Sequence, residues 1–200
     1  MRNTIYRILD HPWVYKLQES ILAPGAGKNI VNIISLVLDQ LPKAQRVLDI
    51  GCGPSSWLWK LGTYPVGLDI SQIYARKYYQ KDGDVVVASA AYVPFPDNYF
   101  EGVFSLGLLH HVSFAIASEI ISECIRVCRT GGYITIFDNL LPEFKHRPFP
   151  FLLRKMDRGK FVRDERHLNA LFPSVYRWTK QRKTYTPTGL EMMVYWMIKE

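Results

Sequence analysis

The sequence predicts an α/β fold in which helices cover both faces of a largely parallel sheet. Two observations support this. Short apolar runs alternate with amphipathic segments, and the first run ends in the glycine turn Gly51-Cys52-Gly53. We expect strands over 46–50, 65–69, 85–88, 102–105 and 133–138, and helices over 55–61, 71–80 and 115–127. Strands that alternate with helices build a parallel sheet with helical layers on either side.

The two ends of the chain differ from this alternating region. Apolar residues at helical spacing predict one or two short helices between 6 and 22, interrupted by Pro12. We expect them to pack over the ligand cleft at the edge of the sheet. The same spacing predicts a further helix over 28–41. Segments 174–181 and 191–199 are rich in aromatic and β-branched residues and are separated by 184–189. This pattern predicts a terminal β-hairpin.

Length and composition fit one domain. The chain has 200 residues, of which 48% are hydrophobic and 22% charged. We divide the domain into a helical cap (1–42), a core (43–138), a basic insert (139–172) and a terminal hairpin (173–200). No apolar run approaches the length of a membrane span, and the first ten residues lack the features of a secretory signal. A cytoplasmic protein is therefore expected.

The glycine turn lies between two acids. Asp49 precedes Gly51 by two residues, and Asp69 follows Asp49 by twenty at the end of the second apolar run. Glycines let the backbone bend tightly and let a ligand approach it, as in sites that hold nucleotide-like cofactors at the carboxyl edge of a sheet. The nicotinamide fingerprint places a third glycine where this chain has Ser56. A nicotinamide cofactor is therefore disfavoured.

Four ordered motifs, of which Asp69 at the end of the second apolar run is one, together resemble the class I S-adenosylmethionine-dependent methyltransferases. Asp49-x-Gly51-x-Gly53, with Ser55 as a third small residue, resembles their first motif. Residues 93–112 look like the "LPFPDxSFDxVxSxxxLHHV" segment of the small-molecule branch, and 126–136 are similar to its "RVLKPGG" turn. The resemblance implies a three-layer Rossmann-like sandwich. Its seven-stranded, mostly parallel sheet has the order 3-2-1-4-5-7-6 and an antiparallel last strand.

The resemblance also implies S-adenosylmethionine as cofactor and a set of residues that bind it. Asp69 would accept hydrogen bonds from both ribose hydroxyls. Relatives usually carry an acid for the adenine amino group where this chain has Ser89, so the adenine would depend more on backbone near Ala90 and on Ile70. The full set is Asp49, Gly51, Cys52, Gly53, Asp69, Ile70, Ser89, Ala90 and Ser105.

Methyl transfer needs a general base only when the acceptor is still protonated, so candidate bases are predicted from their place at strand ends. His110 and His111 follow the fourth strand and Asp138 closes the fifth. Each keeps a structural interpretation as well, because a histidine can bond backbone and an acid can cap a helix. His11, Tyr15 and His146 are weaker candidates for which an ordinary lid or surface position is preferred.

Positive charge is concentrated in the basic insert. The formal net charge of the chain is +7. Residues 145–166 include eight basic and three acidic residues, a net charge of +5, and contain the apolar run 148–153. A solvated face is the ordinary interpretation, but cations beside aromatics also suit an anionic or lipid-like acceptor. Arg158 and Arg163 are the cations whose charge reversal would test the hypothesis of an anionic acceptor.

Three function classes stay open. We favour a small-molecule methyltransferase, with a homodimer left open. A nucleic-acid methyltransferase is encouraged by the charge, but the Asn/Asp-Pro-Pro-aromatic motif of base-amine methylation is absent after the fourth strand, where 105–108 read Ser-Leu-Gly-Leu. A non-catalytic, cofactor-binding partner subunit is the third class, which Ser89 keeps open.

Three cysteines give little sign of metal or disulfide chemistry. Cys52 lies in the glycine turn, and Cys124 and Cys128 are four residues apart on a predicted helix. Small buried side chains are the simpler interpretation. No metal is assigned.

Overall fold

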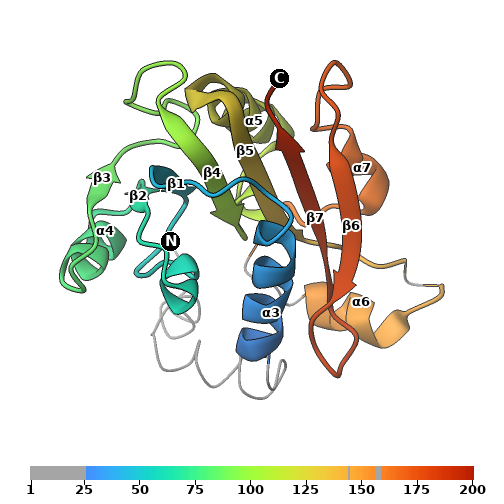
Figure 1. Cartoon of the computed structure of the whole chain (residues 1–200). Helices are drawn as coiled ribbons and strands as arrows, with labels where there is room; N and C mark the ends of the chain where they lie inside the picture. Colours follow the sequence, from blue (N-terminus) through green and yellow to red (C-terminus); the bar gives the residue numbers. More distant parts are fainter. Residues whose placement is uncertain (1–25, 144, 156–158) are drawn as a thin grey trace, which may run out of the picture.

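The computed structural model describes residues 26–143, 145–155 and 159–200 and shows a seven-stranded sheet between helical layers (Figure 1). The strands are β1 (Val47–Ile50), β2 (Val66–Asp69), β3 (Val85–Val87), β4 (Phe100–Leu106), β5 (Cys128–Asn139), β6 (Thr179–Thr184) and β7 (Glu191–Ile198). Their order is β3-β2-β1-β4-β5-β7-β6, and β7 runs antiparallel to both β5 and β6. The predicted order and the antiparallel last strand are confirmed.

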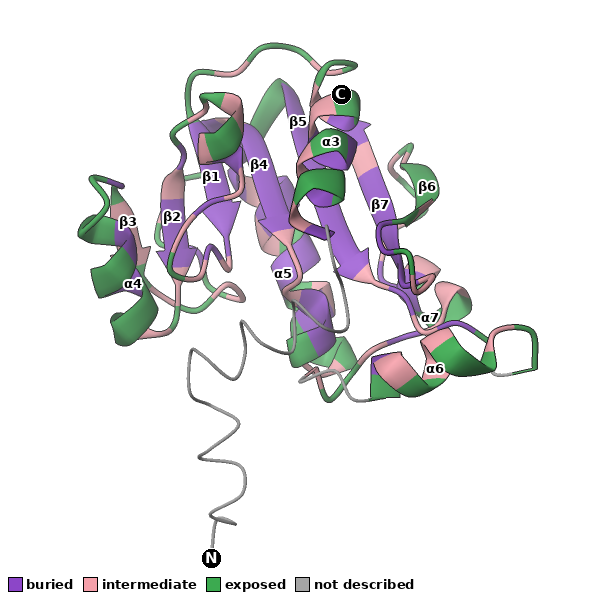
Figure 2. Cartoon of the chain, turned by 90° about the horizontal axis from the view of Figure 1, so that it is seen from below, coloured by how far each residue is buried: buried purple, intermediate pink, exposed green. Residues whose placement is uncertain are grey.

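The helices are α3 (Ala26–Leu38), α4 (Gln72–Tyr79), α5 (Phe114–Val127), α6 (Pro148–Lys155) and α7 (Glu165–Asn169), with 3-10 turns η1 (Leu58–Leu61) and η2 (Leu109–His111). One apolar cluster lies between the sheet and α5 and α7, and a second lies between the sheet and α3. Figure 2 shows the largely buried strands β1, β4, β5 and β7, whereas β6 and much of the helix surfaces are exposed. The sheet is therefore covered on both faces.

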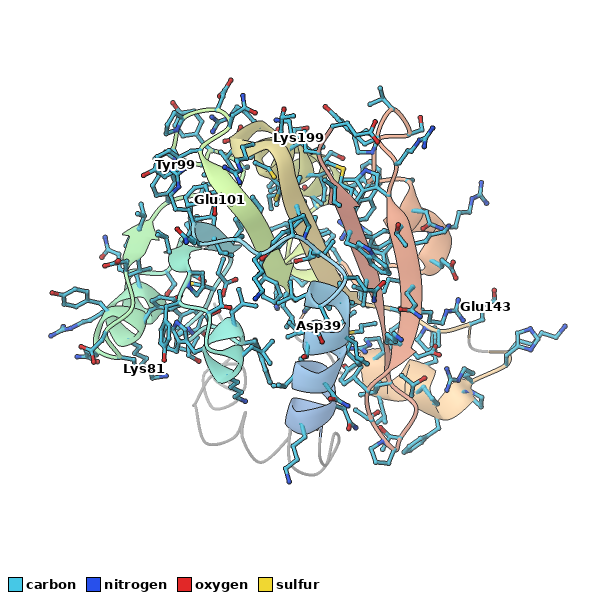
Figure 3. All side chains as sticks on the ribbon, viewed as in Figure 1. Asp39, Lys81, Tyr99, Glu101, Glu143 and Lys199 are labelled. Atoms are coloured by element: carbon cyan, nitrogen blue, oxygen red, sulfur yellow. The ribbon has the colours of Figure 1, made fainter. Side chains whose placement is uncertain are left out.

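The carboxyl ends of β1, β2, β4 and β5 meet at one edge, because these strands are parallel. Figure 3 shows Glu101 and Lys199 near the opposite edge, and Glu143, which follows β5, far from both. The segment before β4 is fixed by Arg126 of α5, whose guanidinium donates to the carbonyls of Val93 and Phe95 at 2.8 Å each. Because β1, β2, β4 and β5 are parallel, the loops that follow these four strands begin at the same edge of the sheet.

Two predicted elements were wrong in form. Residues 55–61 form only the 3-10 turn η1, because the Ser56 hydroxyl accepts from the Leu58 amide at 3.2 Å and Gly62 closes the turn with φ of 75°. The strand predicted over 174–181 begins only at Thr179. Tyr176 and Trp178 pack against the apolar core from the preceding loop, so their aromatic character reports burial rather than strand.

Other predictions differ in detail. The basic insert contains α6 and α7, which were not predicted, and Cys128 begins β5 instead of continuing the helix of Cys124. All three cysteines are free and buried. The N-terminal helices predicted over 6–22 lie outside the described residues. None of the described helices combines the length and the apolar character needed to cross a bilayer.

Candidate active site

The glycine turn leaves room beside the backbone at the end of β1. Gly51 and Gly53 have φ of 73° and 60°, values that favour glycine. Amides of Gly51 and Cys52 donate to the Leu68 carbonyl at 2.7 and 3.1 Å, which fixes the turn on β2. In the described part of the chain, no heavy atom apart from those of its two chain neighbours lies within 4 Å of the place where a Cβ of Gly53 would be. A ligand can therefore approach the main chain here.

Asp69 is held next to this turn. Its Oδ2 accepts from the Gly53 amide at 3.0 Å, and its Oδ1 accepts from the Ser71 amide at 2.8 Å. Ser71 in turn caps α4 by accepting from the Tyr74 amide. A carboxylate has further lone pairs beyond these two bonds, so Asp69 can still accept from a ligand.

Asp49 and Cys52 lie deeper. Asp49 is 3% exposed, and burial, with a smaller contribution from Asp69, raises its pKa to about 7 against the hydrogen bond of Ser56. Burial also raises the pKa of the Cys52 thiol, so this side chain stays neutral. The site thus contains a carboxyl group that changes charge near neutral pH.

The remaining predicted cofactor residues separate into two kinds. Ile70 is 75% exposed beside Asp69, Ser89 is exposed and accepts from the Ala91 amide at 3.3 Å, and Ala90 is half-buried. Ser105 is 1% exposed and donates to the Ile50 carbonyl at 2.9 Å, so its hydroxyl is engaged inside the sheet. The side chains of Ile70, Ser89 and Ala90 are therefore more accessible to a ligand than the side chain of Ser105 is.

The structure brings His110 and Asp138 together as a buried pair. Nδ1 of His110, in η2, bonds Oδ1 of Asp138 at the end of β5, and the two residues are 5% and 2% exposed. The same Oδ1 accepts from the Asn139 amide at 2.8 Å. No helix begins directly after Asp138, so its alternative role as a helix cap was wrong. The Asn139 side-chain amide lies 3.5 Å from Nε2 of His110.

The other histidines are placed differently. His111 is exposed, with its ring centroid 4.2 Å from that of His110. His146 lines an open cavity of about 800 Å³ between the insert and β6, and it pairs with Glu143 at 3.5 Å. None of the predicted cofactor residues lines this cavity. His11, Tyr15 and Arg158 lie outside the described residues.

Arg163, one of the two cations named in the acceptor hypothesis, bonds the protein backbone in this structure. It is 8% exposed and donates to the carbonyls of Leu109 and Val112 at 2.7 Å each. Sequence reasoning also missed Gly159, whose backbone lies against the imidazole of His110. Nothing in the local sequence marks either contact, because both connect segments about fifty residues apart. In the described ranges no three His, Cys, Asp or Glu side chains gather as a candidate metal site.

Comparison with known proteins decides the family. Residues 48–136 match a family model described as a methyltransferase domain. An uncharacterized methyltransferase of Synechocystis is 30% identical over 158 residues, which make up 74% of this chain and 71% of that protein. The chain therefore belongs to the class I S-adenosylmethionine-dependent methyltransferases. The family resemblance seen in the sequence is thus confirmed.

Other proteins match part or nearly all of this methyltransferase. A tRNA (carboxymethyluridine(34)-5-O)-methyltransferase of Arabidopsis thaliana is 31% identical over 108 residues, or 52% of this chain, and the match spans only 26% of the plant protein. A SAM-dependent methyltransferase structure from Thermotoga maritima has a TM-score of 0.74 at 15% identity and covers 97% of this chain and 100% of its own. That likeness shows the fold.

S-adenosylmethionine is the cofactor of this methyltransferase. The residues present fit it. Gly53 leaves open space at the turn, Asp69 offers a fixed carboxylate beside that space, and Ile70 exposes an aliphatic side chain next to the carboxylate. A nucleoside with a ribose diol and an apolar base face needs these three features.

Proposed function

We propose that this methyltransferase transfers a methyl group to an ionisable O–H or N–H group of a small, anionic acceptor. The observation that supports this is the buried His110–Asp138 pair, which joins the η2 turn after β4 to the end of β5. Ligands of open α/β sheets bind at the carboxyl ends of the strands. A base at this place suits an acceptor that must lose a proton.

S-adenosylmethionine supplies an electrophilic methyl group on a positively charged sulfur. The chain then has mainly to bind and orient its ligands. In this proposal the backbone of 51–53 and the Asp49 carboxyl hold the amino-acid end, Asp69 binds the ribose hydroxyls, and Ile70, Ser89 and Ala90 surround the adenine. Cys52 and Ser105 support the turn and β1 from inside.

His110 would act as the base. Because Asp138 accepts from Nδ1, the neutral imidazole carries its basic lone pair on Nε2. A proton taken by Nε2 makes an imidazolium, which the buried carboxylate of Asp138 stabilises. Asp138 is thus a positioning partner of the base. His111, exposed beside it, has the weaker claim to the same role.

The charge of the insert supports an anionic acceptor even without Arg163. Lys145, Lys155, Lys160 and Arg166 are exposed. Phe149, 58% exposed on α6, adds apolar surface in the same insert. Cations beside apolar surface suit a molecule that carries both a negative charge and hydrocarbon.

Substitution of the base tests the proposal. We expect His110→Gln to lower the rate of methyl transfer about 100-fold or more, because general-base catalysis contributes roughly that much. Affinity for S-adenosylmethionine should stay unchanged. The measurement is transfer of radioactive methyl to a cell extract separated into lipid, small-molecule, protein and nucleic-acid fractions. His167→Gln, an exposed residue of α7, is the matched control. Equal rates in wild type and His110→Gln would contradict a base role for His110.

Nucleic acid is the second candidate acceptor, because one surface favours it. Tyr74 and Tyr79 on α4 are 43% and 71% exposed, and the neighbouring Arg76 and Lys77 are exposed and form no ion pair among the described residues. Aromatic rings beside cations can stack bases and bind phosphates. Several relatives are tRNA methyltransferases. Label in the nucleic-acid fraction would favour this candidate, and label in no fraction would favour a non-catalytic partner subunit.

A further inference from the structure

A short part of the basic insert lies directly on the η2 turn that carries His110. We call residues 159–163 the clamp segment. Its end is fixed to the sheet, because the Leu141 amide donates to the Arg163 carbonyl at 2.8 Å and Leu140 forms a parallel bridge with Arg163. The clamp segment is thus anchored where β5 ends, two residues after Asp138.

The clamp segment takes up the carbonyl groups at the end of η2. The Phe161 amide donates to the His110 carbonyl at 3.0 Å. The Arg163 guanidinium donates to the carbonyls of Leu109 and Val112 at 2.7 Å each. The Leu109 carbonyl also accepts from the Val112 amide within the turn at 3.3 Å, whereas the carbonyls of His110 and Val112 lie at its end, where donors of the turn itself run out. Three carbonyls of four consecutive residues are therefore held by one segment from the insert.

Gly159 touches the imidazole itself. A Cβ at this position would overlap Cδ2 of His110 and would lie 2.7 Å from its carbonyl oxygen. Only glycine permits this approach without displacement of the ring. The imidazole is thereby confined between Gly159 and the carboxylate of Asp138.

We infer that the clamp segment is a positioning device that keeps Nδ1 of His110 on Asp138, with Gly159 and Arg163 as its positioning residues. The inference rests on the proposed function for the purpose of the device, but its structural claim is independent of the acceptor. The charged and titratable groups around the ring in the described structure are Asp138 of β5, Arg163 of the clamp segment, and His111 of η2. Only Asp138 carries a negative charge among them, so contact with it favours the imidazolium.

Gly159→Ala tests the inference without touching the base. We expect the added methyl group to push the ring away from Asp138, so that the pKa of His110 falls by about one unit, since a carboxylate partner of a histidine typically shifts its pKa by that much or more. The measurement is an NMR titration of the imidazole nitrogens in the full chain, with His110 assigned by comparison with His110→Gln. Gly27→Ala, where an added Cβ would lie at an ordinary 3.8 Å from Trp57, the nearest of the described residues beyond its own helix, is the matched control.

A pKa of His110 in Gly159→Ala equal to that in wild type and in Gly27→Ala would overturn the inference. Arg163→Lys is the second variant, used if Gly159→Ala does not fold. Lysine keeps the positive charge but lacks the fork that reaches two carbonyls, so we expect the pKa of His110 to fall there too and the His110 Nδ1 proton to exchange faster. An unchanged titration and exchange rate would again overturn the inference.

The proposed function fails by a different result. If Gly159→Ala displaces His110 while His110→Gln transfers methyl at the wild-type rate, the clamp segment positions a residue that is not the base. If His110→Gln is slow and Gly159→Ala has an unchanged His110 pKa, the base is real and the clamp segment does not position it. The two claims are thus separated by one titration and one rate.

Discussion

Asp69→Ala should weaken S-adenosylmethionine binding about 100-fold. The variant would lack the two charge-assisted hydrogen bonds that we propose between the carboxylate and the ribose, which together are worth about 3 kcal/mol. It would also release the Gly53 amide, now held at 3.0 Å, so the glycine turn would be less well ordered. Isothermal titration calorimetry measures the affinity. Asp69→Asn, which keeps the shape and loses the charge, should bind with intermediate affinity.

Asp84→Ala is the control for this substitution. Asp84 is an exposed acid next to β3 whose side chain forms no hydrogen bond or ion pair in the described structure. Its loss should leave the affinity unchanged. Melting temperatures of both variants show whether the fold is intact. Wild-type affinity in a folded Asp69→Ala variant would sink the assignment of Asp69 to the cofactor.

The core of the fold could be predicted because its signals are local. Each parallel strand is a short apolar run, and turn chemistry marks the point where β1 ends. The helix predicted over 55–61 was wrong because one serine side chain takes a backbone amide, a competition that composition does not show. The strand predicted over 174–181 was displaced because aromatic residues in a loop fill the core as well as strand residues do.

The candidate site likewise contains some residues that local sequence signals predicted and some contacts that they did not. Gly51 and Gly53 belong to one short motif, Asp69 ends the next apolar run, and the structure places them together across the parallel pair β1 and β2. His110 and Asp138 were predicted as separate candidates, but their pairing joins residues 28 apart and depends on the register of β4 and β5. The contact of Arg163 with Leu109 spans 54 residues. This contact with η2 could only be seen in three dimensions.

Asp49 gives the stability of this methyltransferase a pH dependence that Asp49→Asn should remove. Burial raises the pKa of Asp49 to about 7 from 3.8. Between these values the folded protein binds this proton more tightly than the unfolded chain, so the contribution of Asp49 to stability is fully present below about pH 4 and is lost as pH rises to 7. The neutral amide avoids the cost of a buried charge. Asp49→Asn should therefore be more stable at pH 8 by up to about 4 kcal/mol and about equal at pH 4.

Urea unfolding at pH 5, 6, 7 and 8 measures this difference, with Asp84→Asn as the control. The gain should grow with pH and level off above 7, and parallel curves for wild type and Asp49→Asn would contradict a raised pKa. The same variant should bind S-adenosylmethionine more weakly at pH 8. The ligand carries positive charge, and Asp49→Asn removes a negative charge two residues before the glycine turn. Greater stability with weaker binding would show that a destabilising buried carboxylate is kept for the cofactor.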